Sequence, residues 1–211
     1  YIPLRYKSRK DKHPPIIAIC DVSGSMSRYS RMLLHFMHVL TTLRNDVHTF
    51  LFGTRLTNVT RFLRFKDVDE ALAATSSAVE DWSGGTRIGD CLKEFNFKWS
   101  RRVLGPGAIV LFITDGLDRG GGIGLSKQIK LIQKSSKRLI WLNPLLRYEE
   151  FAPKPTGVKA ILPHVDEFRP IHSLESMDQL VNALSEINLQ SRFNMAPWLE
   201  KLSEIENAEC H

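Results

Sequence analysis

Five side chains with oxygen donors stand in three separate segments of this 211-residue sequence, each beside a predicted strand end or helix start. Asp21, Ser23 and Ser25 alternate directly after a short apolar run, and Asp115 follows a second apolar run. Thr86 closes a polar Ser-Gly-Gly-Thr turn that precedes a segment with helical spacing. Hard oxygen donors with no His or Cys in the same motifs favour Mg²⁺, Mn²⁺ or Ca²⁺ over zinc or copper. These residues therefore predict a site for one divalent cation, with Mg²⁺ as the default ion.

Glycines and charged residues beside these donors predict the rim of the site. Glycine has no Cβ, so a tight loop can bring its backbone close to an ion or to a partner. Arg87 directly follows Thr86, where it would steer an acidic partner or simply be solvated. The glycine-rich segment 116–124 lacks the spacing of phosphate-binding motifs, so we expect a flexible loop at the rim. The residues predicted to contact a partner are Gly24, Gly85, Arg87, Gly116, Asp118 and Arg119.

The hydrophobic pattern predicts the elements that position these residues. Apolar runs without alternation indicate strands covered on both faces at 16–20, 47–52, 108–114 and 138–142. The alternating segment 57–63 indicates an exposed antiparallel edge strand. Helical spacing occurs at 31–43, 68–79, 88–99 and 125–137. This alternation predicts an α/β fold with a doubly wound, mostly parallel sheet and helices on both faces, in which ligands bind at the carboxyl ends of the strands.

The chain is predicted to consist of a basic extension, one domain and a helical tail. Residues 1–14 hold Arg5, Lys7, Arg9, Lys10 and Lys12, which we interpret as a solvated linker rather than a nucleic-acid arm. Residues 15–189 form the domain, which is expected to end with a short strand or turn at 160–163 and a helix at 174–187. Residues 190–211 form a tail whose apolar stripe is expected to pack back on the domain.

Composition favours a soluble, cytoplasmic protein. Hydrophobic residues make up 43% of the chain, charged residues 25%, and no apolar run approaches the roughly 18–20 residues that span a bilayer. The three cysteines are odd in number and form no CxxC pair, so neither a disulfide framework nor a zinc knuckle is indicated. No signal peptide is recognisable, but the chain starts at Tyr1 rather than Met, so secretion is unsupported rather than excluded.

The order and spacing of Asp21-x-Ser23-x-Ser25, Thr86 and Asp115 resemble the metal-ion-dependent adhesion site of von Willebrand factor A (VWA) domains, which have a Rossmann-like fold. The resemblance implies that the two serine hydroxyls and the threonine hydroxyl contact the metal. It also implies that the two aspartates act largely through water.

Further segments resemble the CoxE group of VWA domains, over about residues 1–187 of this chain. They are Phe-Leu-Phe-Gly-Thr-Arg-Leu-Thr at 50–57, Asp-Trp-Ser-Gly-Gly-Thr-Arg-Ile-Gly at 81–89 and Trp-Leu-Asn-Pro at 141–144. This resemblance implies a role in maturation of molybdenum enzymes such as carbon monoxide dehydrogenase, beside a MoxR-type AAA+ ATPase. The expected partners are that ATPase and a client metalloenzyme.

Docking is the predicted activity, because three neutral hydroxyls leave a dication with unneutralised charge and an open position for a carboxylate. A metal-dependent hydrolase is the alternative enzyme, for which Asp21 would be a nucleophile or a direct ligand of a catalytic ion. An RNA-binding module that uses the basic residues of 1–12 is a second alternative. The sequence shows no obvious set of additional carboxylates for hydrolysis, so we expect a protein that is not an enzyme.

Histidine and tryptophan side chains outside the motifs are expected to pack rather than to bind. His35 and His38 stand three apart on one predicted helix, and we expect one to be packed and the other exposed instead of a metal pair. Trp141 is expected in the core or at the rim. Trp82, beside the Gly-Gly-Thr turn, suits packing and binding equally.

Overall fold

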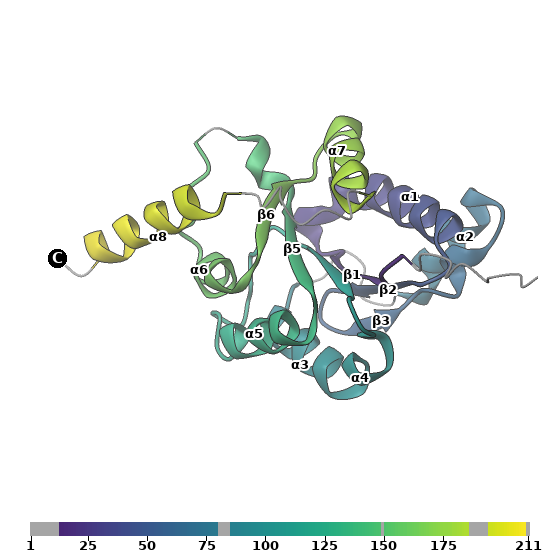
Figure 1. Ribbon diagram of the computed structural model, residues 1–211, viewed down its shortest axis with the longest axis horizontal. Coiled ribbons are helices and arrows are strands. Elements are labelled where there is room, and N and C mark those ends of the chain that lie inside the picture. The colour runs from purple at the N-terminus through teal and green to yellow at the C-terminus, as the bar shows by residue number, and fades with distance from the viewer. Residues whose placement is uncertain (1–12, 80–84, 149, 186–193, 210–211) are drawn as a thin grey trace, which may run out of the picture.

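A central six-stranded sheet organises the part of the chain that the structure describes, which comprises residues 13–79, 85–148, 150–185 and 194–209 of a computed structural model (Figure 1). The spatial order is β3-β2-β1-β4-β5-β6, and every neighbouring pair is parallel except β2 and β3. The strands are β1 (Ile16–Asp21), β2 (Val47–Phe52), β3 (Leu56–Asn58), β4 (Ile109–Ile113), β5 (Arg138–Asn143) and β6 (Glu167–Pro170). The predicted doubly wound fold with one antiparallel edge strand is therefore confirmed.

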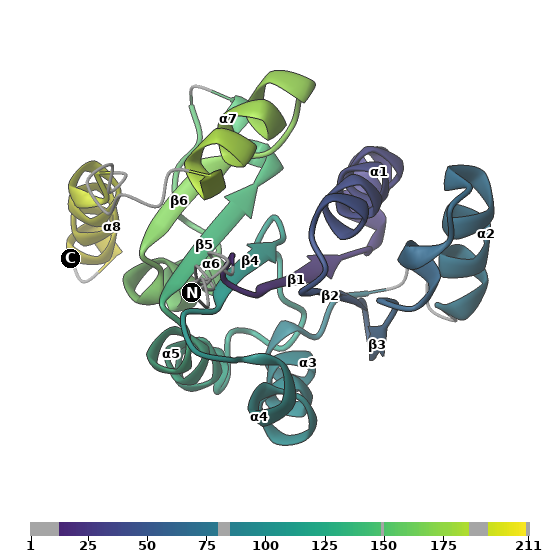
Figure 2. The ribbon, with the colours of Figure 1, turned by 45° about the vertical axis from the view of Figure 1, so that its right-hand side comes forward.

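Helices cover both faces of the sheet, as Figure 2 shows. One face carries α1 (Ser27–Leu43), α2 (Val68–Ala78) and α7 (Leu174–Ser185). The other carries α3 (Ile88–Lys98), α4 (Ser100–Val103), α5 (Leu125–Ser135), α6 (Thr156–Ile161) and α8 (Ala196–Glu209). Short 3₁₀ turns complete the described elements: η1 (Gly24–Met26), η2 (Phe62–Arg64), η3 (Pro144–Arg147) and η4 (Leu162–His164). None of the described helices has the length and apolar character needed to cross a lipid bilayer.

Two hydrophobic cores explain why the central strands read as continuous apolar runs. Along β1, Ile16, Ala18 and Cys20 face the core beneath α1 and α7. Ile17 and Ile19 face the core beneath α3 and α5. All five side chains are buried, because successive residues of a strand point to opposite faces and helices cover both.

The edge strand predicted at 57–63 is shorter than expected. β3 ends at Asn58, and the chain then turns inward, so that Val59 and Leu63 are fully buried. The Thr60 hydroxyl oxygen accepts a hydrogen bond from the Thr49 backbone N–H at 3.0 Å. The Thr60 side chain thus takes the place of the next backbone acceptor that a longer β3 would offer to β2, and the edge strand ends there.

The end of the domain also differs from the prediction. Residues 160–163, expected as a strand or turn, belong to α6 and η4, and the last strand is β6. This strand is only four residues long and includes two charged side chains, Glu167 and Arg169, so it carries no apolar run. Its burial depends on partners that lie far away in the sequence.

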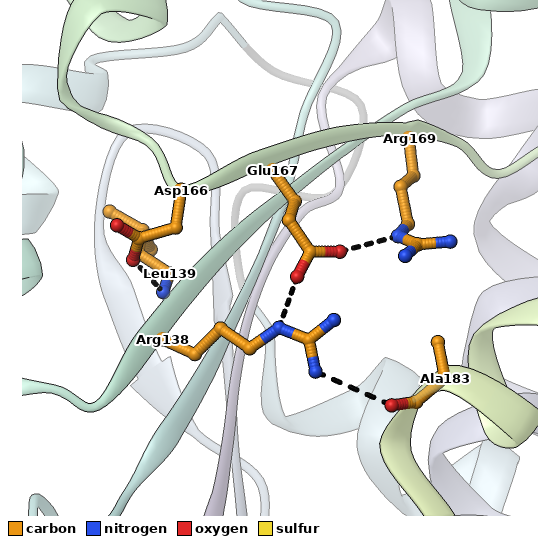
Figure 3. A network of polar contacts seen from close by, with 6 residues as sticks. All are labelled: Arg138, Leu139, Asp166, Glu167, Arg169 and Ala183. Carbon is orange, nitrogen blue, oxygen red and sulfur yellow. Dashed lines mark hydrogen bonds and ion pairs between the residues drawn. The ribbon is translucent and has the colours of Figure 1, made fainter. Parts of the chain in front are cut away.

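A buried ion-pair network fixes β6 against β5 (Figure 3). Glu167 is 2% exposed, and its two carboxylate oxygens accept hydrogen bonds from the Nε atoms of Arg138 and Arg169, the latter at 2.6 Å. Arg138 also donates to the Ala183 carbonyl of α7 at 3.3 Å. We refer to Arg138, Glu167 and Arg169 as the edge network, because it joins the last strand and α7 to the rest of the sheet.

The helical tail packs back on the domain, as expected. The Trp198 ring of α8 lies 5.2 Å from the Phe168 ring and 5.9 Å from the Phe151 ring, in both cases edge to face. Leu202, one turn further, is 4% exposed within the same core as α5 and α6. The boundaries predicted after residues 14 and 189 stay predictions, because 1–12 and 186–193 lie outside the described residues.

Candidate metal centre

The predicted donor residues meet at the carboxyl ends of β1 and β4, the two central strands. β1 pairs with β2 on one side and with β4 on the other, so successive connections leave it in opposite directions. Loops diverge at such a point and leave room for a ligand. Asp21 is the last residue of β1, and Asp115 lies two residues after the end of β4. Both carboxylates are buried, with exposures of 0% and 2%.

Both oxygens of the Asp21 carboxylate are held by hydrogen bonds. Oδ1 accepts from the Ser23 backbone N–H at 2.8 Å, and Oδ2 accepts from the Thr114 hydroxyl at 2.8 Å. The carboxylate therefore links the loop after β1 to the end of β4, and its orientation is fixed by neutral donors from both segments. In the sequence, Thr114 is only the last residue of the apolar run 108–114, and the structure gives it this positioning role.

The three predicted hydroxyl ligands line one cleft. The 3₁₀ turn η1 places the Ser23 and Ser25 hydroxyl oxygens 3.2 Å apart. Ser23 and Thr86 are nearly buried, whereas Ser25 is exposed at the mouth. All three line a cleft of about 380 Å³. The hydroxyls thus converge from two loops that are about 60 residues apart in the sequence, as a shared cation would require.

Asp115 lies behind the hydroxyl residues rather than on the cleft wall. Its Oδ1 accepts from the Leu117 backbone N–H at 3.0 Å, and its backbone carbonyl accepts from the Asn143 side-chain amide at 3.3 Å. It is not among the residues that line the cleft, yet its charge raises the pKa of Asp21. The arrangement has hydroxyls in front and carboxylates behind, which is the arrangement that the sequence resemblance implies.

The electrostatics of the site favour a cation. Burial raises the pKa of Asp21 to about 6, and the neighbouring Asp115 charge adds to this rise, whereas hydrogen bonds from Ser23 and Thr114 lower it. Among the described residues, no Lys or Arg forms an ion pair with either aspartate. A buried carboxylate without a cation is unfavourable, and a dication nearby would offset that penalty.

The donor set fits a hard dication. No group of three or more His, Cys, Asp or Glu side chains that could hold a metal occurs in the described ranges, so hydroxyl oxygens have to complete any metal shell at this site. Two serines and one threonine with two carboxylates behind them provide oxygen ligands only. We therefore assign Ser23, Ser25 and Thr86 as the candidate direct ligands, with Asp21 and Asp115 as the anions that orient and neutralise.

Close packing supports the loop after β4. Gly116 has φ +81°, and a Cβ there would lie 2.8 Å from Val158 Cγ2. A Cβ on Gly157 would lie only 2.2 Å from the Gly116 carbonyl oxygen. Trp141 is fully buried as expected, and its indole N–H donates to the Thr114 carbonyl at 2.9 Å. The structure therefore gives Gly116 a packing role in the interior and does not bring it to the cleft.

The other predicted rim residues have differing positions. Gly24, Gly85, Asp118 and Arg119 line the cleft, whereas Arg87 is exposed beside it. The Asp118 carboxylate is engaged within the fold, because it accepts from the Ile88 backbone N–H at 2.9 Å and the Gly122 backbone N–H at 3.0 Å. Asp118 thereby joins the loop to the start of α3.

One wall of the cleft had no signal in the sequence. Pro155, Thr156 and Gly157, at the start of α6, line it together with Leu117. Pro155, Thr156 and Gly157 lie nearly 40 residues beyond Asp118 in the sequence, and nothing in their types distinguishes them from an ordinary helix start. Trp82 and Ser83, which belong to the segment before Thr86, lie outside the described residues.

The two helical histidines take no part in the site. His38 is 5% exposed, and its Nε2 is hydrogen-bonded to the Phe65 carbonyl oxygen at 2.9 Å, whereas His35 is exposed on the same helix. The expectation of one packed and one exposed histidine is confirmed.

Comparison with known proteins agrees with this fold. Residues 1–177 match the profile of the family described as VWA domain containing CoxE-like protein. No curated protein sequence matches the chain. Proximal thread matrix protein 1 of the mussel byssus is similar in structure at 18% identity and a TM-score of 0.54, over 82% of this chain and 47% of that one. An aerotolerance-related membrane protein from Bacteroides fragilis is similar at 15% identity and a TM-score of 0.52, over 82% of this chain and all (100%) of that one.

A second structure of the mussel protein has a zinc occupied MIDAS motif, that is, a metal-ion-dependent adhesion site. It is 17% identical, with a TM-score of 0.50, over 83% of this chain and 44% of that one. The chain thus spans less than half the length of the mussel protein. At these identities, the likeness establishes a shared fold.

Proposed function

Because the chain belongs to the family of CoxE-like proteins with a VWA domain, we propose that it is a non-enzymatic docking domain that binds an acidic residue of a partner through one divalent cation. Mg²⁺ is the proposed ion, with Mn²⁺ or Ca²⁺ as substitutes. The supporting observation is the pair of buried carboxylates without a paired cation, placed behind three hydroxyl residues that line an open cleft.

Each donor has a distinct task in this proposal. Ser23, Ser25 and Thr86 hold the ion at the cleft wall, while Asp21 and Asp115 orient the shell from behind and lower its net charge. A bound dication supplies positive charge with an open coordination position, which an incoming carboxylate fills. Thr114 keeps Asp21 in place through its 2.8 Å hydrogen bond, so that the carboxylate need not reorganise when the site fills.

Docking fits the geometry better than hydrolysis. A nucleophilic aspartate needs an oxygen that can reach a substrate, but Asp21 has 0% exposure and both of its oxygens accept hydrogen bonds. The burial of Asp21 keeps a substrate away from both oxygens. We therefore retain the non-enzymatic role.

The family membership suggests the identity of the partner. We propose that the domain acts with a MoxR-type AAA+ ATPase in the maturation of a molybdenum enzyme such as carbon monoxide dehydrogenase. A cytoplasmic location forms part of this proposal, and the free, buried thiol of Cys20 fits a reducing compartment.

Capture of a MoxR-type ATPase on the immobilised chain tests the proposal. We expect capture in Mg²⁺ that is lost in EDTA and in Ser25→Ala, whose side chain is exposed and whose loss should not unfold the domain. Ser77→Ala on α2 is the matched control, because it removes an exposed serine hydroxyl on a helix outside the cleft and should capture normally. Capture that is equal in EDTA, or turnover of phosphate or ester substrates that depends on Asp21, would contradict the proposal.

A further inference from the structure

Arg119 places a second positive group on the cleft wall. It lines the same cleft as Ser23, Ser25 and Thr86. Its guanidinium lies over Gly85, since a Cβ on that glycine would be 2.5 Å from Cζ and 2.5 Å from Nη1. Its backbone N–H donates to the Thr86 carbonyl at 3.0 Å. The main chain of Arg119 is therefore hydrogen-bonded to the segment that carries a proposed metal ligand, and its guanidinium lies against Gly85 of the same segment.

The charge of Arg119 is not neutralised within the described part of the protein. No described carboxylate lies within ion-pair distance of it. The adjacent carboxylate of Asp118 is occupied by two backbone N–H groups, of Ile88 and Gly122. A guanidinium that lies on a cleft wall and lacks an anion is suited to bind a carboxylate from outside in a bidentate manner.

The surroundings of the cleft extend this positive character. Arg28 at the start of α1, Arg87 before α3 and Arg147 in η3 are exposed on loops and helix ends at the same edge of the sheet. With Arg119 they outnumber the exposed acidic groups at this edge among the described residues, which are Asp90 in the first turn of α3, Glu150 after η3 and Glu175 in the first turn of α7. An approaching acidic segment is therefore attracted before it reaches the cleft.

We infer that the partner segment carries two acidic side chains, one that completes the metal site and a second that Arg119 binds. This inference rests on the proposed docking function. The cleft of about 380 Å³ falls in the range of roughly 300–1,000 Å³ that is typical of ligand pockets, so it exceeds the room that one carboxylate needs. Gly85 is required because any side chain there would displace the guanidinium.

An acidic peptide suits this surface better than RNA. Proteins that bind single-stranded nucleic acid stack bases on aromatic side chains. None of the described residues that line the cleft is aromatic. The hydroxyl-lined metal site also favours a carboxylate, which can enter the open position directly.

Synthetic glycine peptides provide the test, with one glutamate in the reference peptide and two glutamates at increasing separation in the others. Calorimetry or NMR titration in Mg²⁺ should show that the best two-glutamate peptide binds about threefold to tenfold tighter than the reference. Arg119→Gln should remove this gain, so that the two-glutamate peptides bind the variant no more tightly than the reference peptide does. Arg119→Lys should keep part of the gain, and Gly85→Ala should reduce it.

Arg101→Gln is the matched control, because it removes one exposed arginine from α4, which precedes β4 and so lies towards the amino ends of the strands. The inference is overturned if no separation gives a gain, or if the gain persists in Arg119→Gln. It is also overturned if a single-stranded uridine oligomer binds more tightly than the best peptide and depends on Arg119. If the proposed docking function itself is wrong, the reference peptide will bind equally in Mg²⁺ and in EDTA. That result would overturn both the docking function and the inference about two acidic side chains.

Discussion

Two buried carboxylates in this molecule have opposite surroundings. Glu167, in the edge network, lies between the guanidinium groups of Arg138 and Arg169 (Figure 3). Asp21, at the candidate metal centre, lies between a backbone N–H and the Thr114 hydroxyl, with a second carboxylate nearby. The two side chains are 2% and 0% exposed. The protein therefore buries both anions but supplies cations to only one.

The difference separates a structural carboxylate from a ligand-binding one. Burial of an anion is unfavourable unless it is paired. At the edge of the sheet, two arginines provide this pairing within the chain and hold β6 and α7 in place. At the centre of the sheet, no described Lys or Arg pairs with the charge, which supports the proposal that an external cation does so.

The largest effect is expected when the internal pairing is broken. Glu167→Gln leaves two mostly buried arginines, with side chains 23% and 17% exposed, without their anion. Loss of one partner from such a buried pair lowers the free energy of unfolding by about 3–5 kcal/mol. Urea denaturation measures this, with Glu94→Gln as control, since the Glu94–Lys98 pair lies on the surface of α3. A loss below about 1 kcal/mol for Glu167→Gln would show that the edge network is not a structural pairing.

Removal of the charge of Asp21 is expected to raise the free energy of unfolding, whereas removal of the charge of Glu167 lowers it. The folded pKa of Asp21, about 6, exceeds the unfolded value of 3.8, so ionisation destabilises the fold. The contribution of Asp21 to the free energy of unfolding is therefore greatest below about pH 4. It falls by about 3 kcal/mol in total as the pH rises through about 6.

The Asp21→Asn variant isolates this effect. In EDTA near neutral pH, we expect it to be more stable than the native chain by about 2 kcal/mol, because the amide oxygen can accept from the Ser23 N–H and the amide nitrogen can donate to the Thr114 hydroxyl without a buried charge. Denaturation of both proteins across this pH range measures the difference, which Mg²⁺ should diminish by stabilising the native chain alone. A variant that is less stable than the native chain at every pH would refute the contrast with Glu167.

Loss of the hydroxyl that orients Asp21 is expected to lower the free energy of unfolding by less than loss of the Glu167 carboxylate does. Thr114→Val removes the donor to Oδ2 and leaves that oxygen without its partner, which costs about 1.5–3 kcal/mol for a hydrogen bond to a charged group. The pKa of Asp21 should rise further, and Mg²⁺ should bind more weakly below about pH 7. Thr75→Val, which removes another fully buried threonine hydroxyl that has no partner among the described residues, is the control and should leave Mg²⁺ affinity unchanged.

The same contrast explains what the sequence could predict. The strands of the sheet centre are buried on both faces, so Ile16–Asp21 and Ile109–Ile113 read as apolar runs, and the oxygen donors that follow them were predicted to share one edge. β6 could not be predicted, because it is only four residues long and its buried Glu167 is paired by Arg138, which comes from another strand.

Parts of the cleft escaped prediction for a similar reason. Thr156 and Gly157 reach it because α6 packs against Gly116, a contact set by the absence of a Cβ on both glycines. Periodicity and motif spacing describe neighbours along the chain, whereas this wall depends on packing between distant segments. Likewise, no sequence pattern indicates that Asp118 accepts hydrogen bonds from the backbone N–H of Ile88, at the start of α3, and from that of Gly122.

Calorimetric titration with Mg²⁺ tests the central claim most directly. The native chain and Ser77→Ala should each bind one ion, whereas the double variant Ser23→Ala with Thr86→Ala should show no measurable binding while it still unfolds cooperatively. Mn²⁺ should follow the same pattern. If the double variant bound Mg²⁺ as well as the native chain, the hydroxyl-lined cleft would not be the metal site, and the buried charge of Asp21 would need another explanation.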